Sequence, residues 1–106
     1  MRVLFDQGTP APLRLLLPLH EESTAFERGW STLKNGELLH EAEAAGFGVL
    51  VTTDTNLKYQ QNLSARNISV VVLSTTSWPR IKVDCEPIVS AIAAAVPGSY
   101  AEVQVR

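Results

Sequence analysis

A short run of apolar residues near the middle of the chain constrains the fold more than any other feature. The run is Val49-Leu50-Val51, and two threonines and Asp54 follow it. An uninterrupted apolar run between glycines (Gly46 and Gly48) and polar residues is typical of a strand buried on both faces of a sheet. In parallel sheets, ligands bind where loops leave the carboxyl ends of the strands. Asp54 is therefore a candidate site residue.

The N-terminus repeats this pattern. An apolar, strand-like segment over residues 1–5 ends at Asp6, and the turn formers Gly8 and Pro10 follow. If both segments are strands of one parallel sheet, Asp6 and Asp54 share an edge. Two carboxylates held together repel each other unless a cation, a basic side chain or a shared proton offsets the repulsion. A hard divalent ion such as Mg²⁺ fits this sparse set of oxygen ligands.

Strand and helix patterns alternate along the whole chain. They predict a strand ending at Asp6, a helix from Pro10 to Leu17, a weak strand over residues 23–26, a helix from about Glu37 to Ala45, the central strand to Thr53, a helix from about Asn56 to Arg66, a strand over residues 68–73, a helix from Pro87 to Val96 and an edge strand over residues 100–105. This order predicts βαβ units, hence an α/β fold: a three-layer α/β/α sandwich with a mainly parallel sheet of about five strands.

Local signals suggest how several of these elements begin and end. Thr9 and Asn35 are candidate N-caps for the first and second helices, with Pro10 at the first helical position. Residues 74–78 are expected to form a polar loop that Pro79 stops. Trp30 and Trp78 are interpreted as packing residues at loop ends.

Length and composition narrow the class of protein. A chain of 106 residues, with 45% hydrophobic and 19% charged residues, predicts one globular domain over residues 1–106. The net charge of −2 argues against general adhesion to nucleic acid, so a polyanion would need a local basic patch or a metal. The single Cys85 excludes an internal disulfide and favours a reducing compartment. No apolar run approaches the roughly 20 residues that span a bilayer, so we expect a cytoplasmic protein.

Further polar residues are candidates for the same site. Glu37, in the first turn of the second helix, is either a third carboxylate or a surface residue that the helix dipole favours. Asn35 and Asn56 could add neutral oxygen ligands, or each could cap a helix. The amide-rich segment 56–62 could contact phosphate and sugar and stack a base, or it could be a solvated helix face. The side chains concerned are Lys58, Tyr59 and Gln61.

Three segments together resemble a known family. They are Phe5-Asp6-Gln7-Gly8-Thr9-Pro10, Asn35-Gly36-Glu37-Leu38-Leu39, and the tract from Ala45 to Leu57 with its leucine-valine-threonine-x-aspartate block. Over about the first 75 residues the chain is similar to PIN-like domains, in particular to the short bacterial DUF5615-type branch related to VapC-type toxin nucleases. The resemblance implies a ribonuclease that uses Mg²⁺ or Mn²⁺ held by clustered acids.

The resemblance also implies roles for individual residues. Asp6 matches the first acid, and Asp54 matches the acid after the central strand. Asn56 stands at a later position that is often acidic. The acid expected at the start of the second helix falls on Asn35, and Glu37, two positions later, is its substitute. The predicted catalytic residues are therefore Asp6, Glu37 and Asp54.

The predicted metal ligands are these three acids with Asn56, and the predicted substrate contacts are Asn35, Lys58, Tyr59 and Gln61. A toxin of this kind implies a small antitoxin as partner, beside RNA, and a homodimer is a further expectation.

Two other functions fit the same residues. Because asparagines stand at two positions where acids are expected, the chain could be an inactive PIN-like module that binds RNA or a protein. A phospho-acceptor signalling domain also carries aspartates after its first and third strands. It typically has paired acids after the first strand, whereas Gln7 follows Asp6 here.

Overall fold

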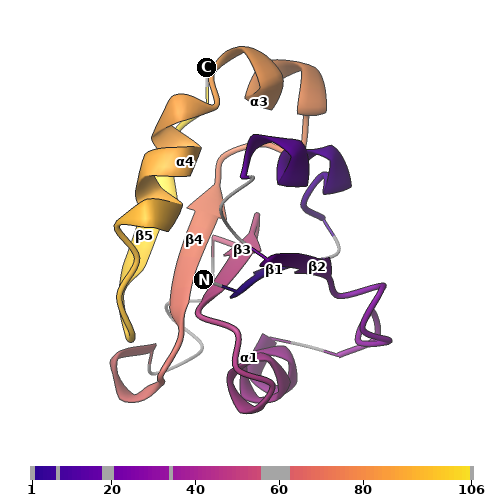
Figure 1. The fold of residues 1–106 in the computed structure, drawn as a ribbon, viewed down its shortest axis with the longest axis vertical. Helices are drawn as coiled ribbons and strands as arrows, with labels where there is room; N and C mark the ends of the chain where they lie inside the picture. Colours follow the sequence, from indigo (N-terminus) through magenta and orange to yellow (C-terminus); the bar gives the residue numbers. More distant parts are fainter. Residues whose placement is uncertain (1, 7, 18–20, 34, 56–62, 106) are drawn as a thin grey trace.

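The computed structural model describes residues 2–6, 8–17, 21–33, 35–55 and 63–105. Its centre is a five-stranded sheet in which every pair of neighbours is parallel, in the order β2-β1-β3-β4-β5. The strands are β1 (Arg2–Phe5), β2 (Glu21–Thr24), β3 (Val49–Thr52), β4 (Ser69–Leu73) and β5 (Tyr100–Val103). The predicted α/β fold with a parallel sheet of five strands is confirmed, and β5 lies at an edge as expected (Figure 1).

Short helical segments connect the strands. They are η1 (Ala11–Leu16), α1 (Asn35–Ala44), η2 (Leu63–Ala65), α3 (Trp78–Val83) and α4 (Glu86–Ala93). Although they are far apart in the sequence, η1 and α3 are in contact, and they lie side by side at the top of Figure 1. Of the helices in the described ranges, none has the length and apolar character needed to cross a membrane.

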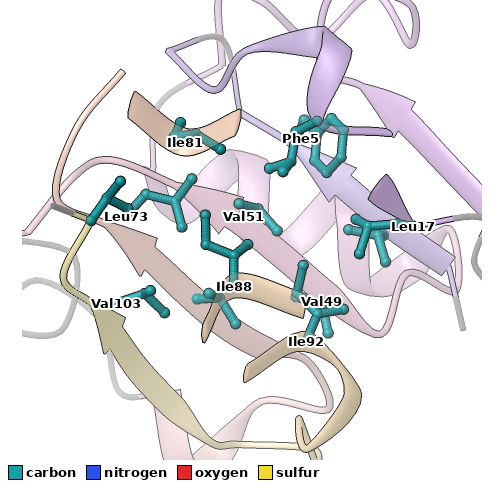
Figure 2. Packing of buried hydrophobic residues seen from close by; sticks show 13 residues of the cluster. Phe5, Leu17, Val49, Val51, Leu73, Ile81, Ile88, Ile92 and Val103 are labelled. Atoms are coloured by element: carbon teal, nitrogen blue, oxygen red, sulfur yellow. The ribbon is translucent and has the colours of Figure 1, made fainter. Parts of the chain in front are cut away.

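Side chains of the strands alternate between two buried clusters, as the pleat of a sheet requires. Figure 2 shows the first cluster, in which residues such as Val51 and Leu73 meet Ile81 of α3 and Ile88 of α4. The second cluster contains Leu4, Leu50, Val70 and Val72 of the strands with Leu38, Leu39 and Ala42 of α1. The three central strands are therefore buried on both faces, which is why they read as continuous apolar runs. The three-layer arrangement of the sandwich remains a prediction.

Several local predictions were wrong in position. The second strand covers Glu21–Thr24 rather than residues 23–26, and α1 begins at Asn35, so Asn35 is its first residue and not its N-cap. The N-cap of η1 is Pro10 rather than Thr9, and η1 is a 3₁₀ helix. Helix α4 ends at Ala93, before Val96.

The loop expected over residues 74–78 ends in a helix that the sequence did not reveal. Helix α3 starts at Trp78, with Pro79 in its first turn, so this proline begins a helix rather than stopping a loop. The tryptophans pack as expected, Trp78 against the first cluster and Trp30 against the second. Most of the helix expected over residues 56–66 lies outside the described residues.

Candidate functional site

The chain leaves β1 through a turn that is bonded to the end of β3. The backbone N–H of Asp6 donates to the carbonyl of Val51 (2.9 Å). The hydroxyl of Thr9 donates to the same carbonyl (2.9 Å), and the N–H of Thr9 donates to the carbonyl of Asp6 (2.9 Å). Thr9 is buried, and its side chain links the turn after β1 to β3 instead of capping a helix. The turn that carries Asp6 is held against β3.

Thr52, the last residue of β3, connects the two candidate acids. Its hydroxyl donates to Oδ2 of Asp6 (2.8 Å) and accepts from the backbone N–H of Asp54 (3.1 Å). Thr52 is 1% exposed, whereas Asp6 and Asp54 are partly exposed. One buried hydroxyl therefore orients the Asp6 carboxylate and bonds to the backbone of Asp54. The structure brings the two predicted acids to one place on the carboxyl edge of the sheet.

This place is the switch point of the sheet. The strand that follows β1 in the chain, β2, lies on one side of β1, whereas β3 and then β4 lie on the other, so the order of the strands reverses between β1 and β3. The order 2-1-3-4-5 is one of the two common orders of doubly wound sheets, in which ligands bind outside the carboxyl ends of the strands at this switch point. Asp6 follows β1 and Asp54 follows β3, so both acids flank the switch point.

Gly8 allows the turn after β1 to approach the end of β3 closely. A Cβ atom at this position would lie 3.0 Å from Oγ1 of Thr53. That distance is shorter than ordinary contacts between side chains, so a larger residue would displace the turn or the threonine. Gly8 and the threonines Thr9 and Thr53 thus lie together at the carboxyl edge of the sheet.

The other predicted site residues have different outcomes. Glu37 is exposed in the first turn of α1. Within the described ranges, no three His, Cys, Asp or Glu side chains form a group that could hold a metal ion, so Glu37 does not join Asp6 and Asp54 in such a group. Asn35 is the first residue of α1, and its contact with substrate stays a prediction. Asn56, Lys58, Tyr59 and Gln61 fall outside the described residues.

The residues at the switch point have the right chemistry for a hard cation. Asp6 and Asp54 offer carboxylate oxygens, and the threonines around them offer only further oxygens. Mg²⁺ prefers one or two carboxylates and retains several waters, so two acids suffice for a sparse site. The donor set therefore fits Mg²⁺ or Mn²⁺, although a cage of three acids is not formed by the described residues.

Sequence reasoning missed Thr52, Thr9 and Gly8 as site residues. A signal for Thr52 was present, because a threonine two residues before an aspartate can accept a hydrogen bond from its backbone N–H. The contacts of Thr9 and Gly8 with Val51 and Thr53 depend on how β1 and β3 pair, which no local pattern encodes. Comparison of this chain with protein-family models, with curated proteins and with solved structures found no match.

Proposed function

We propose that the protein is a Mg²⁺- or Mn²⁺-dependent ribonuclease whose site is the edge of the sheet at the carboxyl ends of β1 and β3. The observation that carries the proposal is the bonding of Thr52 to both the Asp6 carboxylate and the Asp54 backbone at the switch point of the sheet. The resemblance to PIN-like domains, which rests on the same residues, supplies the substrate class.

Asp6 and Asp54 would hold the metal ion, and Glu37 and Asn56 are the predicted additional ligands. When bound, such an ion supplies a water of lowered pKa and stabilises the charge on a phosphate. Residues around the acids would hold the Asp6 carboxylate in one orientation. Thr52 fixes the rotamer of Asp6, and the Thr9 bond to Val51 fixes the turn that carries it. A carboxylate held in this way loses little conformational freedom when it binds a cation.

The test has two measurements on the same variants. We expect the wild type to bind Mn²⁺ in isothermal titration and to cleave single-stranded RNA only when Mg²⁺ or Mn²⁺ is present. Asp6→Asn and Asp54→Asn should lose both properties while their thermal unfolding remains cooperative. Asp84→Asn, a matched change at the end of α3, should keep both. Full RNA cleavage by Asp54→Asn would refute the proposal.

A second candidate is a module that binds RNA or a protein without cleaving RNA. Asn35 and Asn56 favour it, because they stand at two positions where the resemblance implies acids, and the described residues form no three-acid group. The same titration separates the two functions. RNA binding together with no detectable Mn²⁺ binding would establish the non-catalytic module.

The partners and location are part of the proposal. A toxin nuclease would act in the cytoplasm, be blocked by a small antitoxin and, in our expectation, form a homodimer. A gene for a small protein beside the gene of this chain, whose product co-purifies with it and suppresses RNA cleavage, would support this assignment. Sedimentation equilibrium of the purified chain tests the dimer.

A further inference from the structure

Arg14 of η1 lies near two carboxylates and is bonded to one of them. Its guanidinium forms an ion pair with Glu27, in the turn that follows β2. The hydrogen bond with Glu27 is the main cause that raises the pKa of Arg14, and the negative charges of Glu27 and Glu22 raise it further, against the effect of burial. Glu22 of β2 therefore lies close enough to act on the guanidinium through its charge without bonding to it.

The register of the sheet places Glu22 on the face where η1 packs. Glu22 pairs with Val3 of β1, so the two side chains lie on the same face of the sheet. On that face Val3 belongs to the first buried cluster together with Leu13 of η1. Arg14 directly follows Leu13 in the helix. Arg14 and Glu22 thus both belong to the region where η1 meets this side of the sheet.

Each of these two residues has one buried polar atom without a hydrogen-bond partner. The atoms are Nε of Arg14, which is a donor, and Oε1 of Glu22, which is an acceptor. In the part of the chain that the structure describes, they are the only buried side-chain nitrogen or oxygen atoms left without a partner. A buried polar group without a partner costs more free energy than an exposed ion pair contributes. The two atoms would satisfy each other if they met.

We propose that Arg14 exchanges between two positions, the observed one on Glu27 and a second one in which its Nε–H donates to Oε1 of Glu22. The second position gives both buried atoms a partner and gives up an ion pair that solvent screens, since the side chains of Arg14 and Glu27 are 36% and 49% exposed. Loss and gain oppose each other, so both positions are populated. The exchange is independent of the proposed nuclease activity, because neither Asp6 nor Asp54 takes part in it.

The exchange determines how the turn after β2 is attached to η1. Inside the turn, the backbone N–H of Thr24 donates to the Glu27 carboxylate (2.9 Å), and the N–H of Glu27 donates to the Thr24 hydroxyl (3.0 Å). These bonds stay within the turn, whereas the ion pair with Arg14 joins the turn to η1. The turn presents Phe26, which is 78% exposed and lines an apolar groove together with Leu15 of η1. In the second position of Arg14, the two walls of this groove are no longer tied together.

The experiment measures the hydrogen-exchange rate of the Arg14 Nε–H by NMR in isotope-labelled protein, with Arg14→Lys to identify the signal. In Glu27→Ala, Arg14 has only Glu22 as a partner, so this exchange should be at least about tenfold slower than in the wild type, the factor that one hydrogen bond to a charged group gives. The double variant Glu22→Leu/Glu27→Ala should lose this protection. Glu41→Ala, which removes an exposed carboxylate from α1, is the matched control and should exchange as the wild type does.

Two further measurements decide between exchange and a fixed ion pair. Glu22→Gln keeps the shape of the side chain and removes its charge, so in the Glu27→Ala background it should give an intermediate rate. Glu22→Leu alone confines Arg14 to Glu27, and the backbone N–H of Glu27 should then exchange more slowly than in the wild type. Equal Nε–H rates in Glu27→Ala and the double variant would overturn the proposal, as would an unchanged backbone rate at Glu27 in Glu22→Leu.

Discussion

The hydroxyl of Thr52 donates to Oδ2 of Asp6 across 2.8 Å, from the end of β3 to the end of β1. The same hydroxyl accepts a hydrogen bond from the backbone N–H of Asp54, so Thr52 bonds to both predicted acids. Thr52→Val removes these bonds and preserves the shape of the side chain. We expect it to lower Mn²⁺ affinity and RNA cleavage by about 10- to 100-fold, the usual effect of losing a group that orients a ligand.

A conservative variant separates this orienting role from packing. Thr52→Ser keeps the hydroxyl, so it should retain most of the Mn²⁺ affinity that Thr52→Val loses, even though it removes a buried methyl group. The measurements are isothermal titration with Mn²⁺ and initial rates of RNA cleavage. If serine and valine reduce Mn²⁺ affinity equally, Thr52 acts through packing and not through its bond to Asp6.

Gly8→Ala tests the close approach of the turn to β3. The added Cβ would lie 3.0 Å from Oγ1 of Thr53, and crowding of this kind typically costs about 1–3 kcal/mol of unfolding free energy. Thr53→Ala removes the crowded atom, so Gly8→Ala should cost less in that background. Urea unfolding of the four proteins in this double-mutant cycle measures the coupling. If the unfolding free-energy costs of Gly8→Ala and Thr53→Ala are additive, the added Cβ does not crowd Thr53.

The sheet could be predicted from the sequence because its central strands are buried on both faces. Runs such as Val70-Val71-Val72 have no polar interruption, and they identified β1, β3 and β4 with nearly correct ends. The edge strand β2 was misplaced by two residues. Its sequence, Glu21-Glu22-Ser23-Thr24, has no apolar residue, and pairing with β1 rather than burial makes it a strand.

Helix α3 and the details of the site depended on tertiary structure. Helix α3 has six residues, of which only Ile81 is fully buried, so its sequence shows no amphipathic pattern. The helix is in contact with η1, which is far from it in the sequence. The sequence placed Asp6 and Asp54 at one edge, but the role of Thr52 follows from the register between β1 and β3. The groove that Leu15 of η1 and Phe26 line together could not be predicted either, because the two residues are eleven positions apart and only the fold brings them to one groove.

Ile92→Ala should destabilise the protein more than any surface change on the same side. Ile92 is 0% exposed in the first cluster, where α4 packs on the sheet (Figure 2). Truncation of such a residue typically costs about 2–5 kcal/mol of unfolding free energy. Val96→Ala, at a side chain that is 59% exposed just beyond α4, should change it by less than about 0.5 kcal/mol. If Ile92→Ala and Val96→Ala lower the free energy of urea unfolding by similar amounts, α4 does not pack on the sheet through Ile92.

Glu27 links η1 to the turn after β2, and its contribution to stability should depend on pH. The hydrogen bond from Arg14, followed by the bond from the Thr24 backbone, holds the pKa of Glu27 below its ordinary value of 4.5. Because the pKa is lower in the folded state, the charged carboxylate stabilises the fold fully above pH 4.5. This stabilisation is lost as the pH falls through the lowered pKa, where the folded protein also takes up the proton.

Unfolding of wild type and Glu27→Gln between pH 7 and pH 3 measures this effect. The wild type should be the more stable protein at pH 7, and the difference between the two unfolding free energies should shrink below pH 4.5. Glu41→Gln, at an exposed position on α1, controls for the removal of one negative charge from the surface. The exposed ion pair is screened by solvent, so the difference should also shrink in high salt. A difference that stays constant down to pH 3 would show that Arg14 and Glu27 do not form this ion pair in solution, and the turn that presents Phe26 would then lack its link to η1.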